Sequence, residues 1–533
     1  NGTNPNWTDQ PGDNNSAWTG GHAIFAAVPP TATITVEGAQ TFTGMTFLAP
    51  DTDTVSAYDF KAGAGGALVT NTPMTVITLE RDGDSLRFAD ALFDIAIQGT
   101  GGVVKRGGGA LHFYTANSYS GGTILENGRL SVYRTDGLGT GNVTVSGGLL
   151  NMLGGGGLQN TLGSRQLTVG SLGAVTFFSR TDAGTATIDN SGTLHFENSS
   201  AAGGATITNR NGGTVAFWGN VGDASGATIV NEAGALINVS STTGQLTIGS
   251  VSGGGTIRLG PNGLRVGSLG RDEEISGVID EVVGGSGIVG LVKAGTGTLV
   301  LSGQNTYVGT TIAHEGRLAI DGSVSGGTDV SPTGILAGSG SIAGLVRVGA
   351  GGVLEGRPGQ ALTMGELRLY SVGGNDSIID VALGAPSSVA LFNVTGALTL
   401  DGRLNVSDAG GFTNGVYRLF DYGGVLTNKG LVITSLPAGH NPGDWSIDTG
   451  TAGQVDLLAI AGPGVQYWDG ANTTPGGVAN GRGGSGTWNA SYTNWTNQAG
   501  TINAPWAGGT AVFAPQVGNY TVTVEGEQSF TGL

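Results

Sequence analysis

Three successive segments of this chain repeat one short apolar pattern at nearly constant spacing. They are ATIDNSGTLHF (186–196), ATITNRNGGTVAFW (205–218) and ATIVNEAGALINV (227–239). Their alignment places Ile188, Ile207 and Ile229 in register, at steps of 19 and 22 residues. A unit of about 20 residues that holds only short strands and turns cannot bury its apolar side chains alone, so copies must stack. The sequence therefore predicts a β-solenoid.

The same alignment brings three asparagines into register, Asn190, Asn209 and Asn231. We expect the strands to stack in parallel about 4.8 Å apart, with the isoleucines forming a continuous apolar core. We expect the asparagines to stack at one turn, because asparagine tolerates the left-handed conformation and can bond to neighbours above and below. The alternative is that these are turn asparagines that recur by chance.

Glycine content favours the same class of fold. The 533 residues include 103 glycines, and only 11% of residues are charged. There is no three-residue period of the collagen type, and Val, Ile, Leu and Phe recur in short alternating runs, which argues against disorder. Glycine costs about 1 kcal/mol at each interior helix position relative to alanine. The composition predicts an all-β chain with glycine at the corners of the solenoid.

Charge and cysteine content exclude several classes of function. The net charge of −17 makes nucleic acid an unsuitable partner. Absence of cysteine removes disulfides, thiol catalysis and Cys-ligated zinc. No apolar run approaches the roughly 18 residues of a membrane helix. The chain has no initiator Met or signal peptide, so we expect a mature segment or a fragment of a longer protein.

A thirty-residue pattern occurs twice without a gap, at 103–132 and 291–320. Thirteen of the thirty positions match, mainly glycines, apolar residues, the pair Asn117/Asn305 and the pair Tyr119/Tyr307. Matching residues of these types fix backbone shape and packing, whereas a catalytic repeat is expected to hold polar groups that converge. The repeat therefore indicates a function that depends on extended architecture.

A second repeat joins the two ends of the chain. Residues 1–45 align without gaps on residues 489–533, with 22 identities, and six of the eight tryptophans lie in or beside these copies. We infer that the chain begins inside one copy of a unit of about 488 residues and ends inside the next. We expect three regions: a first Trp-rich module over 1–60, a β-helix over 61–462 that contains both thirty-residue copies, and a second Trp-rich module over 463–533.

The segment GTGTLVLSGQNTYVGTTIAHEGRLAI (295–320) resembles the autotransporter-associated β-strand repeat found in passenger domains of type V secreted proteins. ILAGSGSIAGLVRVGAGGVLEGRPG (335–359) resembles the segments that follow such repeats. In the first copy, TANSYSGG (115–122) departs from the more typical SGxNTYxG. The resemblance implies a right-handed, single-stranded parallel β-helix, displayed on the surface of a Gram-negative bacterium. It also implies a C-terminal outer-membrane β-barrel, which we expect in the parent protein because no series of membrane strands closes this chain.

No motif in the sequence predicts a catalytic or metal site. The G-x-S-x-G elbow is missing, the five histidines are scattered, and we assign no metal or cofactor. Three groups of charged residues are candidates for polysaccharide lyase or hydrolase chemistry. They are Asp51, Asp53 and Asp59; Arg81, Asp82, Asp84, Arg87 and Asp90; and Arg271, Asp272, Glu273 and Glu274 with Asp280 and Glu281. Solvated loops are the favoured interpretation of each group.

Four tryptophans near the C-terminus form the one feature of the sequence that is typical of a ligand-binding surface. They are Trp468, Trp488, Trp495 and Trp506, set among Asn, Thr, Tyr and Gly. Aromatic faces stack on sugar rings through apolar contact, so these residues are candidate glycan contacts. The favoured alternative is that they cover a solenoid end at the joint between 488-residue units, since an uncovered rung has unpaired backbone groups.

The sequence thus predicts a non-enzymatic, surface-displayed passenger, a rigid β-helical stalk or fibre for adhesion, cell–cell contact or biofilm formation. Its expected partners are further copies of itself, in tandem or side by side, the outer-membrane barrel of the parent protein, and a host or matrix glycan. The alternative is a carbohydrate-active or carbohydrate-binding β-helix.

Overall fold

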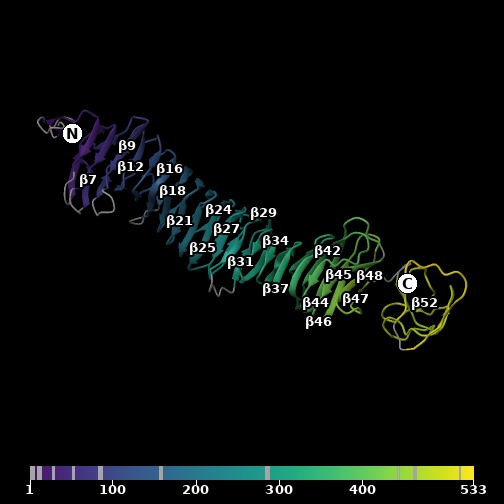
Figure 1. Ribbon diagram of the computed structural model, residues 1–533. Coiled ribbons are helices and arrows are strands. Elements are labelled where there is room, and N and C mark those ends of the chain that lie inside the picture. Colours follow the sequence, from purple (N-terminus) through teal and green to yellow (C-terminus); the bar gives the residue numbers. More distant parts are fainter. Residues whose placement is uncertain are drawn as a thin grey trace. The chain divides into compact units, whose positions relative to one another are not determined.

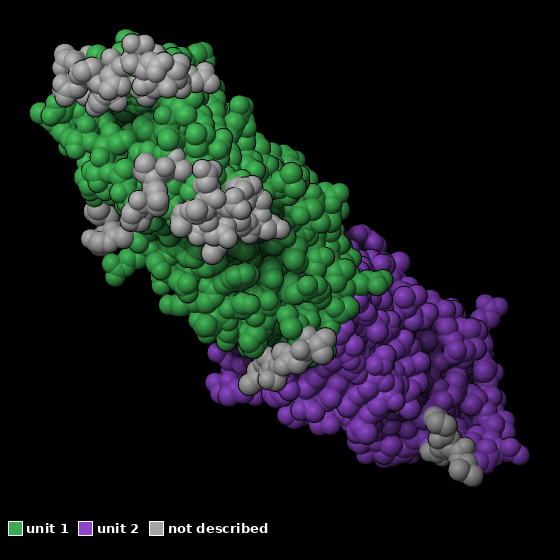
Figure 2. All heavy atoms as spheres, turned by 60° about the vertical axis from the view of Figure 1, so that its left-hand side comes forward, with its two compact units in different colours: residues 1–310 green, residues 311–533 purple. Residues whose placement is uncertain are grey.

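The computed structural model describes residues 7–8, 15–26, 31–50, 55–81, 88–154, 160–282, 289–413, 415–440, 442, 445–459, 465–514 and 518–533. In these ranges the regular structure is β-strand, with no α-helix, and hence no helix long and apolar enough to span a membrane. The prediction of an all-β chain is confirmed. The chain divides into two compact units, residues 1–310 and 311–533 (Figure 2).

Unit 1 is a parallel β-solenoid, and we call each circuit of its chain a rung (Figure 1). Successive rungs add strands to two parallel ladders. The first ladder runs through β3 (His22–Phe25), β6 (Gly44–Phe47), β9 (Met74–Leu79), β12 (Gly102–Arg106), β14 (Thr123–Leu125), β16 (Val143–Leu153), β18 (Gln166–Phe178), β20 (Thr187–Asn190), β22 (Thr206–Asn209), β24 (Ala224–Asn231), β26 (Leu246–Ser252), β28 (Leu264–Val266) and β31 (Val289–Lys293).

The second ladder of unit 1 follows the same order. It runs through β4 (Thr31–Val36), β7 (Val55–Ala62), β10 (Phe88–Asp94), β13 (Ala110–Phe113), β15 (Arg129–Val132), the later parts of β16 and β18, β21 (Thr193–Glu197), β23 (Thr214–Gly219), β25 (Leu236–Thr242), β27 (Thr256–Leu259) and β30 (Ile279–Glu281). Near the N-terminus, β5 (Ala39–Thr41), β8 (Ala67–Val69) and β11 (Ile97–Gln98) form a third, short parallel sheet.

The predicted isoleucine register is present in the first ladder. Ile188 pairs with Ile207, and Ile207 with Ile229, in parallel register, and all three side chains are buried. Burial alternates along these strands because successive side chains of a strand point to opposite faces. The residues of the approximately 20-residue period therefore form one continuous apolar core, which confirms the parallel β-solenoid.

Aromatic rings stack at the same spacing in the second ladder. The ring centroids of Phe177 and Phe196 are 5.0 Å apart, and those of Phe196 and Phe217 are 5.1 Å apart, with interplanar angles of 10° and 14°. These distances are close to the spacing of hydrogen-bonded strands, so rings at equivalent positions lie nearly parallel. The backbone register of the rungs thus determines the geometry of the core.

Glycine occupies corners where a side chain has no room. Gly148 lies within β16, where the strand passes from the first ladder to the second through an irregularity in register after Val145. Its φ is 77°, and a Cβ atom there would lie 2.5 Å from the carbonyl oxygen of Gly128 on the preceding rung. Both the left-handed backbone and the close approach of the neighbouring rung require glycine at this corner.

The solenoid part of unit 2 is parallel at first and ends in antiparallel pairing. Its parallel strands include β34 (Thr310–Ile320), β36 (Thr328–Ala337), β37 (Ser341–Val348), β38 (Val353–Gly356), β39 (Leu362–Leu369), β42 (Ile378–Leu383), β43 (Phe392–Val394), β44 (Leu398–Asp408), β45 (Val416–Tyr422) and β46 (Leu426–Ser435). Then β48 (Gln454–Ala459) pairs antiparallel with both β45 and β47 (Trp445–Asp448). The parallel ladder therefore stops before residue 462.

The Trp-rich segment after residue 464 forms small sheets of its own. Its strands are β49 (Val465–Trp468), β50 (Gly486–Trp488), β51 (Trp495–Thr496), β52 (Asn503–Ala504), β53 (Thr510–Val512) and β54 (Val522–Val524). In the first Trp-rich segment, by contrast, β3, β4 and β6 belong to the main ladders. The two compact units divide at 310/311. The borders 60/61 and 462/463, expected from composition, stay a prediction.

Replacing Ile207 with Asp places an unpaired carboxylate in the core between two rungs. We expect this substitution to lower the free energy of unfolding by on the order of 3 kcal/mol or more. Thr206→Asp, which changes the adjacent and exposed residue of β22, is the matched control and should change stability by less than about 0.5 kcal/mol. Urea unfolding followed by circular dichroism measures both, and equal curves for the two variants would contradict a buried Ile207.

Candidate functional site

The three asparagines aligned by sequence form a hydrogen-bonded ladder inside unit 1. The Nδ2 of Asn190 donates to Oδ1 of Asn209 at 2.8 Å, and the Nδ2 of Asn209 donates to Oδ1 of Asn231 at 2.9 Å. Each Nδ2 also donates to a backbone carbonyl at 2.9 to 3.0 Å, those of Thr214, Leu236 and Thr256 in order. All three side chains are buried, so each one ties its own rung to the next.

The expected reason for these asparagines is wrong in one respect. None of the three has a positive φ, because each is the last residue of a strand, namely β20, β22 or β24. Their use lies in side-chain hydrogen bonding between rungs and not in a left-handed turn. A primary amide can donate and accept hydrogen bonds at the same time. One asparagine can therefore bond to the asparagines of the rungs before and after it.

The asparagines at matched positions of the thirty-residue pattern also link neighbouring rungs. Asn117 accepts a hydrogen bond from the amide of Ile97 at 2.7 Å and donates to the carbonyl of Gly137 at 2.6 Å, so it links the rungs before and after its own. Asn305 accepts from the amide of Ile279 at 2.9 Å, which is the corresponding contact in the second copy. Both asparagines therefore form hydrogen bonds with backbone groups of the solenoid.

A matched lysine, which the sequence analysis missed, is buried in both copies. Lys105 lies in β12, and its Nζ donates to the carbonyls of Arg106, Gly107 and Asn127 at 2.7, 2.6 and 3.1 Å. Lys293 repeats the first two contacts at 2.9 and 2.7 Å. Burial lowers the pKa of Lys105 to about 7, although the nearby Asp90 carboxylate opposes this change. The sequence did contain a signal for this lysine, because the motif V-K-x-G occurs in both copies, 188 residues apart.

Tyr119, a second matched residue, is also fully buried. Its hydroxyl lies 2.6 Å from Oγ1 of Thr123, and that Thr hydroxyl donates to the carbonyl of Leu138 at 3.0 Å. Burial raises the pKa of the Tyr119 phenol far above its ordinary range, so the hydroxyl stays a hydrogen-bond donor. Tyr307 of the second copy is buried to the same extent.

The first two groups of charged residues are only partly within the described residues. Asp51, Asp53, Asp82, Asp84 and Arg87 lie outside them. Asp59 forms an ion pair with Lys61 at 3.1 Å, and Arg81 makes an isolated antiparallel bridge with Phe88. Asp90 accepts a hydrogen bond from the amide of Ala110 at 3.0 Å, and burial raises the pKa of its carboxyl.

Aromatic and titratable side chains of the next two rungs lie near Asp90. The Tyr114 and Tyr133 rings stack with centroids 4.4 Å apart, and Nδ1 of His112 is 3.3 Å from the Tyr133 hydroxyl. Burial lowers the pKa of His112, although the Asp90 carboxylate opposes this change. Among the described contacts, Asp90 bonds to the Ala110 amide and His112 lies beside the Tyr133 hydroxyl, and no hydrogen bond joins the two side chains.

The third group of charged residues does not converge. Each carboxylate bonds to its own partner on a neighbouring rung, and Arg271 bonds to Thr228, which lies 43 residues earlier in the chain. The pairs are Arg271 with Thr228 Oγ1, Asp272 with the Thr298 amide, Glu273 with the Val251 amide and Ser250 hydroxyl, Glu274 with the Ser302 hydroxyl, Asp280 with Arg258, and Glu281 with the Val308 amide. Among the described residues, no three His, Asp or Glu side chains are placed to hold a metal ion.

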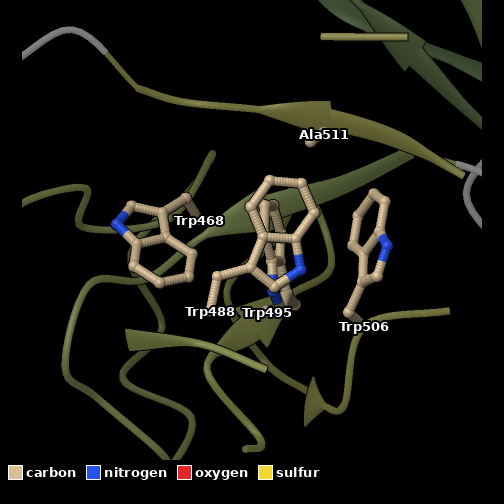
Figure 3. Close-up of a cluster of buried hydrophobic side chains, with 5 residues drawn as sticks. All are labelled: Trp468, Trp488, Trp495, Trp506 and Ala511. Carbon is tan, nitrogen blue, oxygen red and sulfur yellow. The ribbon is translucent and has the colours of Figure 1, made fainter. Parts of the chain in front are cut away.

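The four candidate tryptophans converge on one cluster (Figure 3). Trp488 and Trp495 lie between Trp468 and Trp506, and neighbouring ring centroids are 4.5 to 5.0 Å apart. The indole of Trp468 donates to the carbonyl of Gly484 at 2.8 Å. All four rings are buried, so in this structure they pack against one another and present no face for stacking on a sugar.

Comparison with known proteins agrees with this architecture. Residues 103–132 and 291–320 match the passenger-associated-transport-repeat family. Over 144 residues the chain is 38% identical to the adhesin BmaC autotransporter of Brucella suis biovar 1 (strain 1330), which covers 25% of this chain and 4% of the adhesin. With the parallel β-solenoid, these similarities confirm the resemblance to autotransporter passenger domains that was drawn from the sequence.

Replacing Asn209 with Ala tests the asparagine ladder. The change leaves the buried carbonyl of Leu236 and Oδ1 of Asn231 without their donor, so we expect a loss of about 1–3 kcal/mol in the free energy of unfolding. Asn211→Ala, at an exposed position of the same segment, is the control and should be nearly neutral. Chemical denaturation distinguishes the two, and a neutral Asn209→Ala would show that the ladder adds no stability.

The buried lysine predicts a dependence of stability on pH. The folded pKa of Lys105 is about 7 and its ordinary value is 10.5, so between these values the unfolded chain binds more protons. Stability should therefore rise with pH across this window. In Lys105→Met this contribution is missing, so the difference in unfolding free energy between the natural chain and the variant should grow in favour of the natural chain from pH 6 to pH 9. Parallel pH profiles would refute the lowered pKa.

Proposed function

We propose that this chain is a non-enzymatic, rigid segment of a surface-displayed passenger, a stalk or fibre that serves adhesion, cell–cell contact or biofilm formation. The observation that carries the proposal is the use of polar side chains in unit 1. Asn190, Asn209, Asn117 and Lys105 all bond between or along rungs, where a catalytic site would bring such groups to a common point.

Stiffness follows from these contacts. A rung is held by two parallel backbone ladders and, at many positions, by a buried side-chain hydrogen bond to the next rung. Bending such a stack separates strands on one side, which breaks several hydrogen bonds at once. A segment of this kind transmits position and force along its length, which is what a stalk requires.

Similarity to an adhesin supports the proposed location. The relative is named an adhesin autotransporter, and the matched part is a small fraction of it. We place this chain on the outer surface of a Gram-negative bacterium, held by the outer-membrane β-barrel of its parent protein. Lateral association of such segments is the natural route from a stalk to a biofilm filament, with a host or matrix glycan as a further partner.

Carbohydrate binding is the second candidate function. The observation that favours it is the stacked pair of Tyr114 and Tyr133, which lies next to His112 and near Asp90. These rings are half-buried, and His112 alternates with the inward-facing Leu111 and Phe113 of β13, so the group lies on the outer side of the second ladder. Aromatic rings beside hydrogen-bonding side chains are suited to pyranose contact.

Beads coated with the full chain test both candidates. We expect them to adhere to epithelial cells or matrix, or to aggregate with one another, more than beads coated with albumin. The double variant Tyr114→Ala/Tyr133→Ala should adhere as the natural chain does if the stalk itself is adhesive, and should lose at least half of the adhesion if carbohydrate binding is the function. Release of reducing sugar from a polysaccharide panel, or no attachment of any kind, would contradict the proposal.

A further inference from the structure

Most arginines of the described residues form an ion pair with a carboxylate. They are Arg106, Arg165, Arg210, Arg258, Arg317, Arg347, Arg357, Arg368, Arg403 and Arg418. Three of the exceptions, Arg129, Arg134 and Arg180, lie close together in unit 1. Their side chains are exposed and form no hydrogen bond or ion pair with a described residue. Unpaired cations stand out in a chain whose net charge is −17.

The register of the second ladder places these three arginines on one face of unit 1. Arg129 begins β15, pairs with Ala110 of β13, and precedes the buried Leu130, so its side chain points outward. Arg134 follows β15 by two residues, and Arg180 follows β18 by two residues. Since β15 and β18 both pair with β16, Arg134 and Arg180 lie on rungs two steps, or about 10 Å, apart.

Aromatic and apolar side chains share this face with the arginines. Tyr114 and Tyr133, whose rings stack, come directly after β13 and β15. Phe178 ends β18 and follows the inward-facing Phe177, so it points outward, and it pairs in register with Leu153 of β16. These outward side chains are half-buried. The face therefore combines tyrosine and apolar side chains with exposed guanidinium groups.

Carboxylates close to the arginines already have other partners. Asp136, two residues after Arg134, forms an ion pair with Arg165 at 2.8 Å. Asp90 accepts a hydrogen bond from a backbone amide of the next rung at 3.0 Å. Burial raises the pKa of Asp90 and the charge of Arg129 opposes this change, but no hydrogen bond among the described contacts joins the two. Within the described residues, the guanidinium groups are thus left to an external anion.

The backbone at Arg180 is unusual for an arginine. Its φ is 64°, a conformation that glycine and asparagine adopt much more readily. Of the five described non-glycine residues with positive φ, four follow strands of the second ladder on this side of unit 1, namely Asp136, Arg180, Asn198 and Ser199. Glycine would fit residue 180 with less strain, so the fold itself does not require an arginine there.

We propose that this face of unit 1 binds an anionic polysaccharide, a glycan chain that carries carboxylate or sulfate groups. Planar guanidinium groups bind both kinds of anion through paired, charge-assisted hydrogen bonds. The aromatic side chains between the arginines contact the sugar rings. The inference rests on the carbohydrate binding proposed above for Tyr114 and Tyr133, and it names the class of glycan.

The separation of the arginines favours a polymer over a small anion. A single phosphate or acidic sugar would require guanidinium groups that converge on one point, whereas Arg134 and Arg180 are about 10 Å apart along the solenoid axis. A polysaccharide that lies along the axis can place one of its charges at each arginine. Nucleic acid is a polyanion too, but its dense charge is repelled by a chain with a net charge of −17.

Binding of the full chain to immobilised heparin and polygalacturonate, measured by surface plasmon resonance, tests the proposal. Heparin carries sulfate groups, whereas polygalacturonate carries carboxylates alone, so binding to one or both identifies the anion. We expect the affinity to fall about 10-fold or more when NaCl is raised from roughly 0.05 to 0.3 M, because salt screens exposed charges. Neutral dextran should bind much more weakly than the anionic probe.

The double variant Arg134→Gln/Arg180→Gly removes two of the unpaired cations without straining the fold, because glycine suits the positive φ at residue 180. We expect it to bind the anionic probe about 10-fold or more weakly than the natural chain. Arg210→Gln/Arg258→Gln is the matched control. It changes the net charge equally but removes arginines that already pair with carboxylates, so it should bind as the natural chain does.

No binding to either anionic probe, or equal binding by the natural chain and Arg134→Gln/Arg180→Gly, would overturn the inference. Equal binding to double-stranded DNA would also overturn it, because the face would then bind any polyanion. Equal binding to dextran would remove the preference for charge and leave carbohydrate binding intact. The bead experiment with Tyr114→Ala/Tyr133→Ala reports on carbohydrate binding without an anionic probe, so failure of the two proposals can be told apart.

Discussion

Parallel hydrogen bonding between successive rungs is the constraint from which most features of this structure follow. Each rung pairs with the next in register, so a residue at one position lies directly over its equivalent about 4.8 Å away. A buried side chain must therefore pack well against the equivalent side chain of the next rung. Isoleucine over isoleucine satisfies this in the first ladder, and Phe177, Phe196 and Phe217 satisfy it in the second.

Buried polar groups are acceptable in such a stack only when they bond along its axis. Asn209 donates to one asparagine and accepts from another, and Lys105 finds three backbone carbonyls close to its own strand. A shift of one residue in register would bury these groups without partners, at a cost of about 1–3 kcal/mol for each. We infer that they fix the register of rungs whose apolar residues are otherwise interchangeable. The carboxylates of the third charged group act similarly at the surface, each on a neighbouring rung.

The ends of a solenoid raise a different problem, because the last rung exposes unpaired backbone groups and apolar side chains. In unit 2, β45 continues the parallel pairing from β43, and β48 then pairs with β45 in the antiparallel direction. The last strand of that ladder therefore does not leave its outer edge unpaired.

Sequence alone determined the features that repeat locally: the all-β class, the stacking period, and the alignment of Ile188, Ile207 and Ile229. These follow from residue spacing, because in a solenoid sequence period and spatial register are the same quantity. The family resemblance came from the same source.

Only the tertiary structure decided how side chains without a period are used. It buried Lys105, it ended strands at the aligned asparagines, and it dispersed Arg271, Glu273 and Asp280 to separate partners. It also gathered the tryptophans, from positions up to 38 residues apart, into one cluster. Such contacts depend on where each rung places a residue around its circuit, and insertions of one or two residues between strands change that placement without altering the pattern.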